Sequence, residues 1–169
     1  MGVCGKILDS GYSLPLINRM PPYLITNDAR TIIGDFSMND NILLREDITE
    51  NVIAIKINHS YNENISEDGL YDITRGYWKI SIKKAERAEY AFSVYKGIIK
   101  EVYRIEKWLP AGAVPRPTLP DAEVPEGRYE FVGKVAEPDI RCKYVDKSIA
   151  NLYRRGEANP IKYFFQSKL

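Results

Sequence analysis

A run of six residues, VIAIKI from Val52 to Ile57, constrains the fold of this chain more than any other segment. Most of its positions are β-branched, and Asn51 and Asn58 bound it on either side. Such a short apolar run between turn-forming residues favours a well-buried strand over a helix. We therefore expect a central strand here, and we expect core positions at Ile53, Ile55, Ile57, Phe131, Val135 and Ile161.

Turn and cap signals divide the rest of the chain into short elements. Ser66 can cap a helix that ends near Gly76, with acidic residues in its first turn. The Lys96-Gly97 turn lies between two aromatic, β-branched runs, which predicts a hairpin, although a spacing of three to four in the second run also permits a helix. We further expect a helix-forming segment from residue 83, a strand at 128–135, a helical turn near 137–145 and a strand at 159–165.

Five of the ten prolines fall in one segment, Pro110 to Gly127. Proline lacks a backbone donor and fixes its own backbone angle, so this segment cannot form a central strand or a helix interior. We expect an exposed loop between two strands. The element order then predicts an α+β, mostly β fold: a small barrel of about six strands with one or two short helices.

With 169 residues, the chain is long enough for one domain with its own core. The net charge of +1 hides an uneven distribution, because residues 1–70 carry −5 and residues 71–169 carry +6. We expect residues 1–51 to be an acidic, turn-rich extension that packs on a barrel of residues 52–169. No secretory segment and no eighteen-residue apolar run occur, so we expect a cytoplasmic protein without a membrane partner.

The window from Tyr71 to Trp108 combines aromatic rings with positive charge. Residues 75–107 hold nine Lys or Arg against four Asp or Glu, a local net charge of +5. Cations neutralise phosphates and aromatic faces stack on bases, so this combination is typical of nucleic-acid binding. The alternative is ordinary packing, in which the aromatic residues belong to the core and the charges to a solvated surface.

The sequence lacks the residue sets of the common catalytic and metal sites. His59 is the only histidine, the chain has two cysteines, and neither phosphate-binding glycine motif occurs. Asp139, Asp146 and Lys147 only weakly resemble a nuclease set, because the last two are adjacent. We therefore expect no catalytic residues, no metal and no cofactor.

The segment from Val52 onward resembles the PUA-like superfamily of small β-barrels, which includes EVE, ASCH, YTH and SRA domains. The resemblance covers about residues 52–165 and rests on five stretches: VIAIKIN, LYDITRGYWKI, YAFSVYKGIIKEVYRIEKW, RYEFVGKV and GEANPIKYF. It implies a barrel that holds an unstacked or modified nucleobase in an aromatic pocket, with basic surface around it. Residues 1–51 lie outside the resemblance.

On that basis we expect a nucleic-acid-binding module whose partner is DNA or RNA, with or without base modification. Trp78 and Tyr71 are the first candidates for base stacking, Arg75 for a phosphate or base edge, and Tyr95 and Trp108 for a pocket wall. Arg154 and Arg155 could add phosphate contacts. Two alternatives stay open: a protein-interaction module, such as an inhibitor or adaptor in bacterial or phage defence, and a hydrolase acting on a nucleotide-like ligand.

Overall fold

The computed structural model describes residues 41–120 and 123–166, which belong to one compact unit, residues 41–169. The turns that the sequence predicts within residues 1–40 lie outside the described residues. Leu43 and Ile48, which belong to the predicted N-terminal extension, contribute buried side chains to the core of this unit. None of the helices in the described part has the length and apolar character that a membrane span requires.

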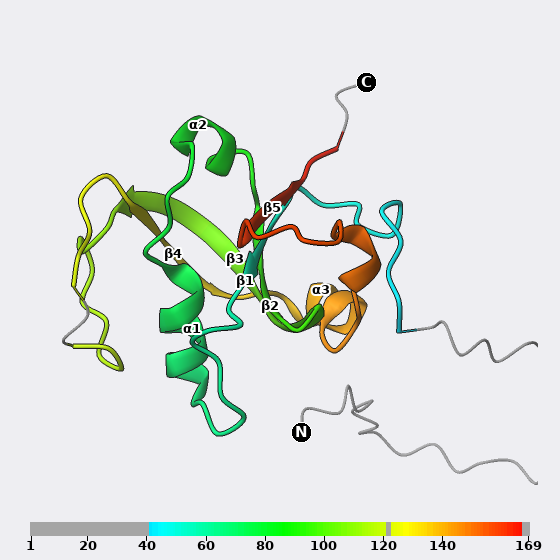
Figure 1. Cartoon of the computed structure of the whole chain (residues 1–169), viewed down its shortest axis with the longest axis horizontal. Helices are drawn as coiled ribbons and strands as arrows, with labels where there is room; N and C mark the ends of the chain where they lie inside the picture. The colour runs from blue at the N-terminus through cyan, green and yellow to red at the C-terminus, as the bar shows by residue number, and fades with distance from the viewer. Residues whose placement is uncertain (1–40, 121–122, 167–169) are drawn as a thin grey trace, which may run out of the picture. The chain divides into compact units, whose positions relative to one another are not determined.

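Five strands form one mixed sheet: β1 (Val52–Lys56), β2 (Tyr90–Tyr95), β3 (Ile98–Pro110), β4 (Tyr129–Val135) and β5 (Ile161–Phe164). Their order in the sheet is β4-β3-β2-β1-β5 (Figure 1). Among these neighbouring strands β1 and β2 run parallel, while the other pairs are antiparallel. The predicted central strand is confirmed, because β1 lies between β2 and β5.

The α+β, mostly β class is confirmed, but the prediction of a closed barrel is wrong. The sheet has two edges, at β4 and β5, and these two strands are not paired with each other in the described structure. β5 has only four residues, and a single bridge between Trp78 and Tyr129 pairs the outer edge of β4 with the chain that follows the first helix. A short strand and a covered edge leave no continuous pairing to close the sheet.

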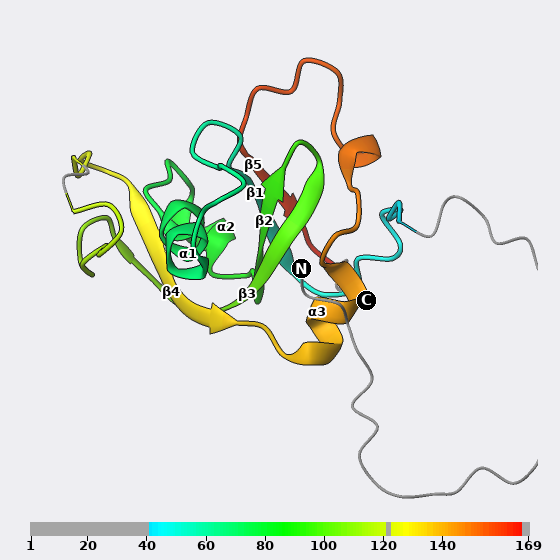
Figure 2. The same cartoon turned by 90° about the horizontal axis from the view of Figure 1, so that it is seen from below.

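Three helices flank the sheet: α1 (Glu67–Arg75), α2 (Ile82–Ala85) and α3 (Pro138–Tyr144). The predicted cap of α1 is confirmed, since the Ser66 hydroxyl accepts a hydrogen bond from the Gly69 amide at 3.1 Å. Both α1 and α2 belong to the connection between the parallel strands β1 and β2, which must cross over one face of the sheet. Figure 2 shows α1 and α3 on opposite sides of the sheet.

The two faces of the sheet carry separate cores because successive side chains of a strand point to opposite sides. Val52 and Ala54 of β1 pack in a first core with Tyr144 of α3. Ile53 and Ile55 pack in a second core, which also contains residues from α1 and from the other strands: Ile57, Ile73, Ala91, Tyr103, Phe131 and Ile161. The core prediction is therefore confirmed for five of its six residues, all of them in the second core.

The predicted hairpin is also confirmed as β2 and β3. Lys96 and Gly97 both have positive φ angles, 48° and 82°, as a two-residue hairpin turn requires. A side chain at Gly97 would meet the Ala150 Cβ at 2.7 Å, so glycine is needed here for packing as well as for the turn. The helical alternative for residues 98–108 is excluded by their strand pairing.

Val135 is the core residue that the sequence places wrongly, since it is 46 % exposed. The alternating pattern of residues 128–135 predicts Val135 on the buried face and Glu130 on the solvated one. In the structure Glu130 has no exposed surface, while the C-terminal end of β4 runs past the core. Specific partners, which periodicity does not reveal, explain the burial of Glu130.

Shortening the side chains of Ile55 in β1 and Val135 in β4 tests which of the two positions lies in the core. We expect Ile55→Ala to lower the free energy of unfolding by about 2 to 5 kcal/mol, because it leaves a cavity in the second core. Val135→Ala is the matched control and should change it by about 0.5 kcal/mol or less. Urea denaturation of both variants measures the difference, and equal losses would contradict this placement of the core.

Candidate functional site

Four of the predicted site residues share one face of the sheet. Tyr71, Trp78, Tyr95 and Trp108 are all partly buried and pack against the second core. They come from α1, from the segment after it, and from β2 and β3. The sequence therefore predicted a group of aromatic side chains that the fold does bring to one face.

Arg75 lies inside the domain and not on this surface, with only 2 % of its side chain exposed. Its Nε donates to Asp72 Oδ1 at 2.9 Å, and its Nη1 donates to Glu130 Oε2 at 2.9 Å. Its Nη2 donates to the carbonyl oxygens of Val114 and Pro115. All three nitrogens are thus occupied by protein acceptors, which leaves no free nitrogen for a phosphate or a base edge.

The same carboxylates hold the proline-rich loop. Glu130 Oε1 accepts a hydrogen bond from the Val114 amide at 3.0 Å, and Asp72 Oδ2 accepts from the amide and the hydroxyl of Thr118. Together, Arg75, Asp72, Glu130, Val114 and Thr118 form what we call the Arg75 network. The loop between β3 and β4 is confirmed as a loop, but it is anchored by buried charges and is not simply exposed.

Electrostatics of the network favour the ionised carboxylate of Asp72. Burial by itself raises the pKa of this carboxyl, but hydrogen bonds from Thr118 and Arg75 outweigh burial and hold the pKa below its ordinary value. A carboxylate that gains partners on folding in this way contributes stability in its charged form. The ion pairs with Arg75 are therefore a structural device of the fold.

Tyr71 lines a pocket of about 290 Å³, which we call the Tyr71 pocket. Its walls come from α1, β3, β4 and α3, and its lining comprises Glu67, Asp68, Leu70, Tyr71, Glu101, Tyr103, Gly133, Lys134, Val135 and Arg141. The Tyr71 hydroxyl accepts a hydrogen bond from the Gly133 amide at 2.9 Å, which fixes the ring at the edge of the pocket. The rings of Tyr71 and Tyr103 lie 5.1 Å apart.

Polar groups of both signs surround these two rings. Glu101 and Arg141 form a two-pronged ion pair with donor–acceptor distances of 2.9 and 2.7 Å. Burial raises the pKa of the Tyr103 hydroxyl above its ordinary value, so the phenol stays neutral. This pocket offers aromatic contacts together with hydrogen-bond donors and acceptors, which is what recognition of a flat polar molecule requires.

Both tryptophans are tied to the backbone through their indole nitrogens. Trp78 Nε1 donates to the Thr74 carbonyl at 2.8 Å, and Trp108 Nε1 donates to the Ala85 carbonyl at 3.1 Å. Backbone hydrogen bonds in both directions also join Trp78 to Tyr129. These contacts give both rings a structural role while leaving them half-buried.

Tyr95 belongs to a different part of the same face. Its ring packs on Tyr61 with a centroid distance of 4.3 Å, and the Lys96 ammonium lies 5.0 Å from its centroid. Neither tyrosine lines the Tyr71 pocket. Among the predicted pocket residues, only Tyr71 lines this cavity.

Arg154 and Arg155 are exposed, but they follow Tyr153, which packs against the first core on the other face. The Tyr153 ring lies beneath the ammonium groups of Lys56 and Lys162, at 4.1 and 5.1 Å. The two arginines therefore follow a residue of the first core, whereas the aromatic site candidates pack against the second core.

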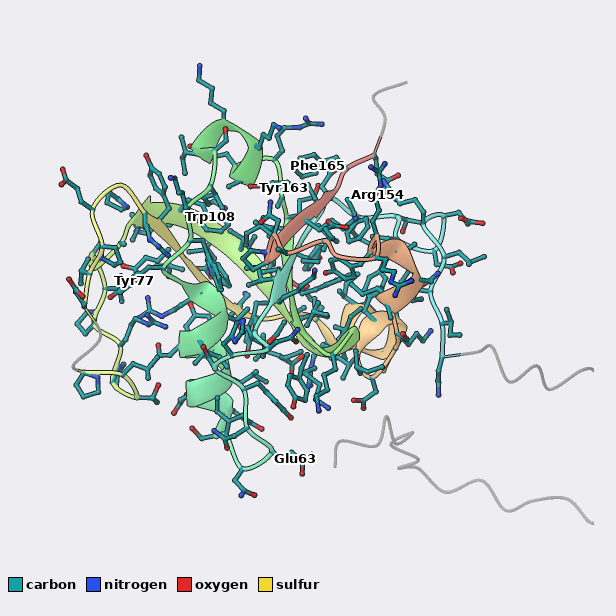
Figure 3. All side chains as sticks on the ribbon, in the orientation of Figure 1. Glu63, Tyr77, Trp108, Arg154, Tyr163 and Phe165 are labelled. Atoms are coloured by element: carbon teal, nitrogen blue, oxygen red, sulfur yellow. The ribbon has the colours of Figure 1, made fainter. Side chains whose placement is uncertain are left out.

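Tyr163 and Phe165 form an aromatic pair that the sequence did not predict as a pair, and their rings lie 5.2 Å apart. The Arg87 guanidinium lies 4.3 Å from the centroid of Phe165, which places the end of β5 beside α2. Figure 3 labels these two rings, with Trp108, near α2. The alternation in IKYFF could have indicated this pair, because it puts Tyr163 of β5 and Phe165, the residue after β5, on one face.

Arg87 belongs to a stretch around α2 that is rich in exposed cations. Lys79, Lys83, Lys84 and Arg87 are all exposed, and none takes part in the six ion pairs found among the described residues. Glu86 is the one carboxylate within residues 79–87, so this stretch carries a net charge of +3. We call these four cations, together with Tyr163 and Phe165, the α2 surface.

No group of three or more metal-binding side chains occurs among residues 41–120 and 123–166. His59 is exposed and lies after β1.

The network predicts a specific response to acid. The contribution of Asp72 to stability is fully present above the ordinary carboxyl pKa of about 4, and it is lost as the pH falls through the lowered value. We expect Asp72→Asn to reduce stability at neutral pH and to weaken the pH dependence of unfolding below about pH 4.5. Denaturation across this range measures it, with the exposed Asp68→Asn as control. An unchanged pH dependence would contradict this role of Asp72.

Comparison with known proteins gives no relative from which a function could be transferred. No family model, no curated protein and no solved structure matches this chain. Its function is therefore argued from the geometry and charge of its own residues.

Proposed function

We propose that this domain binds nucleic acid, with the phosphates at the α2 surface. The observation that carries the proposal is a stretch of four exposed cations without ion-pair partners in the described structure. One of them, Arg87, lies over the half-buried ring of Phe165. Unpaired cations can neutralise phosphates and release counterions. Adjacent rings can stack on bases, which suits an unstacked or single strand.

The contrast with Arg75 supports this placement. Arg75 contributes to the basic window of the sequence, yet its charge is compensated inside the domain by Asp72 and Glu130. The exposed positive charge of the window is concentrated instead around α2. Phosphate binding at a surface of this kind depends on cations that face water.

For base recognition, the Tyr71 pocket is the candidate. Its aromatic side chains offer apolar contact, and the Tyr103 hydroxyl, the Lys134 ammonium and the nearby carboxylates offer partners for the polar edge of a base. Glu67, Asp68 and Glu101 disfavour a phosphate at this position. The resemblance to PUA-like domains leads to the same proposal of a modified or unstacked base, and it stays a prediction.

Binding should first be measured with labelled single-stranded DNA, single-stranded RNA and duplexes, with and without base modification, over a series of salt concentrations. We expect the logarithm of the affinity to fall linearly with the logarithm of salt, with a slope of magnitude ~3 to 6. No binding at low salt, or an affinity independent of salt, would contradict the proposal.

Two double variants, each of which removes two positive charges, then locate the interface. Lys83→Gln/Lys84→Gln removes two cations of the α2 surface and should reduce the salt slope by about 0.7 to 0.9 for each phosphate that the variant no longer neutralises. Arg154→Gln/Arg155→Gln removes two exposed cations that follow Tyr153 of the first core, and it should change the slope less. Equal reductions in the two variants would show that net charge, and not the α2 surface, governs binding.

A further inference from the structure

We propose that a second pocket, beside Tyr77, binds an organic monoanion: a carboxylate attached to an apolar body. This Tyr77 pocket has a volume of about 350 Å³ and lies within the proline-rich loop between β3 and β4. The size is at the lower end of the range for small-molecule sites, roughly 300 to 1,000 Å³. In Figure 3 the Tyr77 side chain lies beside this loop.

The pocket contains one charged residue among its described lining residues, Arg116. Arg116 is only 9 % exposed, and its guanidinium lies 4.6 Å from the centroid of the Tyr77 ring. Within the described structure no carboxylate lies in ion-pair range of Arg116. Arg116 is therefore a nearly buried cation without a direct counter-charge among residues 41–120 and 123–166.

The hydrogen-bonding groups of Arg116 are also incompletely used. Its Nη2 donates to the Asp72 carbonyl oxygen, whereas its Nε is buried and has no acceptor among the described residues. Nη1 makes no hydrogen bond to any residue that the structure describes. The carboxylate oxygens of Asp72 cannot serve as partners without disrupting other bonds, because they accept from Arg75 and Thr118. A bound anion would supply the acceptor and the charge that Arg116 lacks.

The lining decides which anion fits. Apart from Arg116, the pocket is bounded by Tyr77, Val114, Leu119, Val124 and prolines, so it favours an alkyl or aryl body. One guanidinium matches one negative charge, and the carboxylates of the nearby Arg75 network disfavour a dianion. An organic carboxylate meets both conditions, whereas inorganic phosphate has no apolar body and is partly a dianion at neutral pH.

This inference goes beyond nucleic-acid binding and does not depend on it. The α2 surface is exposed and holds several cations, while the Tyr77 pocket is mainly apolar and holds one. Arg116 was not a sequence candidate because it lies in a segment expected to be an exposed loop. Its signal in the sequence is that it is the only cation between Pro110 and Gly127.

Benzoate and benzamide, which share a shape and differ in charge, test the proposal on the full chain. We expect benzoate to cause saturable shifts in the NMR signals of the Gly112 and Val124 amides and of the Arg116 Nε–H group. Benzamide should bind about tenfold or more weakly, since it lacks the charge-assisted hydrogen bond. Inorganic phosphate alone should not saturate these shifts in the same concentration range.

Arg116→Met keeps an extended apolar side chain and should abolish the preference for benzoate over benzamide. It should leave thermal stability unchanged or raised, because it removes a nearly buried cation that has no carboxylate partner in the described structure. Arg155→Met, the same change at an exposed position, is the control and should keep the preference.

Three results would overturn the proposal: equal binding of benzoate and benzamide, an Arg116→Met variant that keeps the preference, or shifts that lie outside the pocket. Saturation by inorganic phosphate at the same concentrations would overturn the requirement for an apolar body. If the Arg116→Met variant does not fold, the comparison of benzoate with benzamide on the natural sequence decides the question.

Discussion

The buried guanidinium of Arg75 connects three parts of the domain that are far apart in the sequence. It bonds to Asp72 within α1, to Glu130 in β4, and to the backbone of the proline-rich loop at Val114 and Pro115. The end of α1 must approach β4 closely for these contacts, and a Cβ at Gly76 would lie 2.7 Å from the Glu130 Cβ. Glycine at this position therefore permits the contact that the Arg75 network requires.

The network also determines which charged side chains are buried and which remain exposed. Two carboxylates and one arginine are buried in the network and compensate one another. The exposed positive charge therefore lies elsewhere, mainly around α2. By fixing the proline-rich loop it also shapes the Tyr77 pocket, whose Arg116 donates to the Asp72 carbonyl. The two proposed ligands, a polyanion and a small apolar acid, therefore have different places on one scaffold.

Local patterns in the sequence predict most of the elements correctly. The β-branched run at Val52–Lys56, the Ser66 cap and the Lys96-Gly97 turn each depend on residues close in the chain, and each is confirmed. Closure of the sheet depends on pairing between its two edges, which no local pattern reports. The barrel prediction was wrong for this reason, and so was the core position of Val135, at the end of β4. The candidate site also depends on contacts between residues far apart in the chain. Arg75 resembles a ligand-binding residue in the sequence, because its partner Glu130 is 55 positions away and no local pattern reveals the ion pair.

Buried carboxylates hold the proline-rich loop in place, and hydrogen exchange of two loop amides tests this role most directly. The Val114 amide donates to Glu130 and the Thr118 amide donates to Asp72. We expect both amides to exchange slowly in the natural protein and rapidly in Arg75→Met, while amides of β2 remain protected in both. Exchange of these two amides at the rate of an unstructured chain in the natural protein would contradict the anchoring of the loop by Glu130 and Asp72.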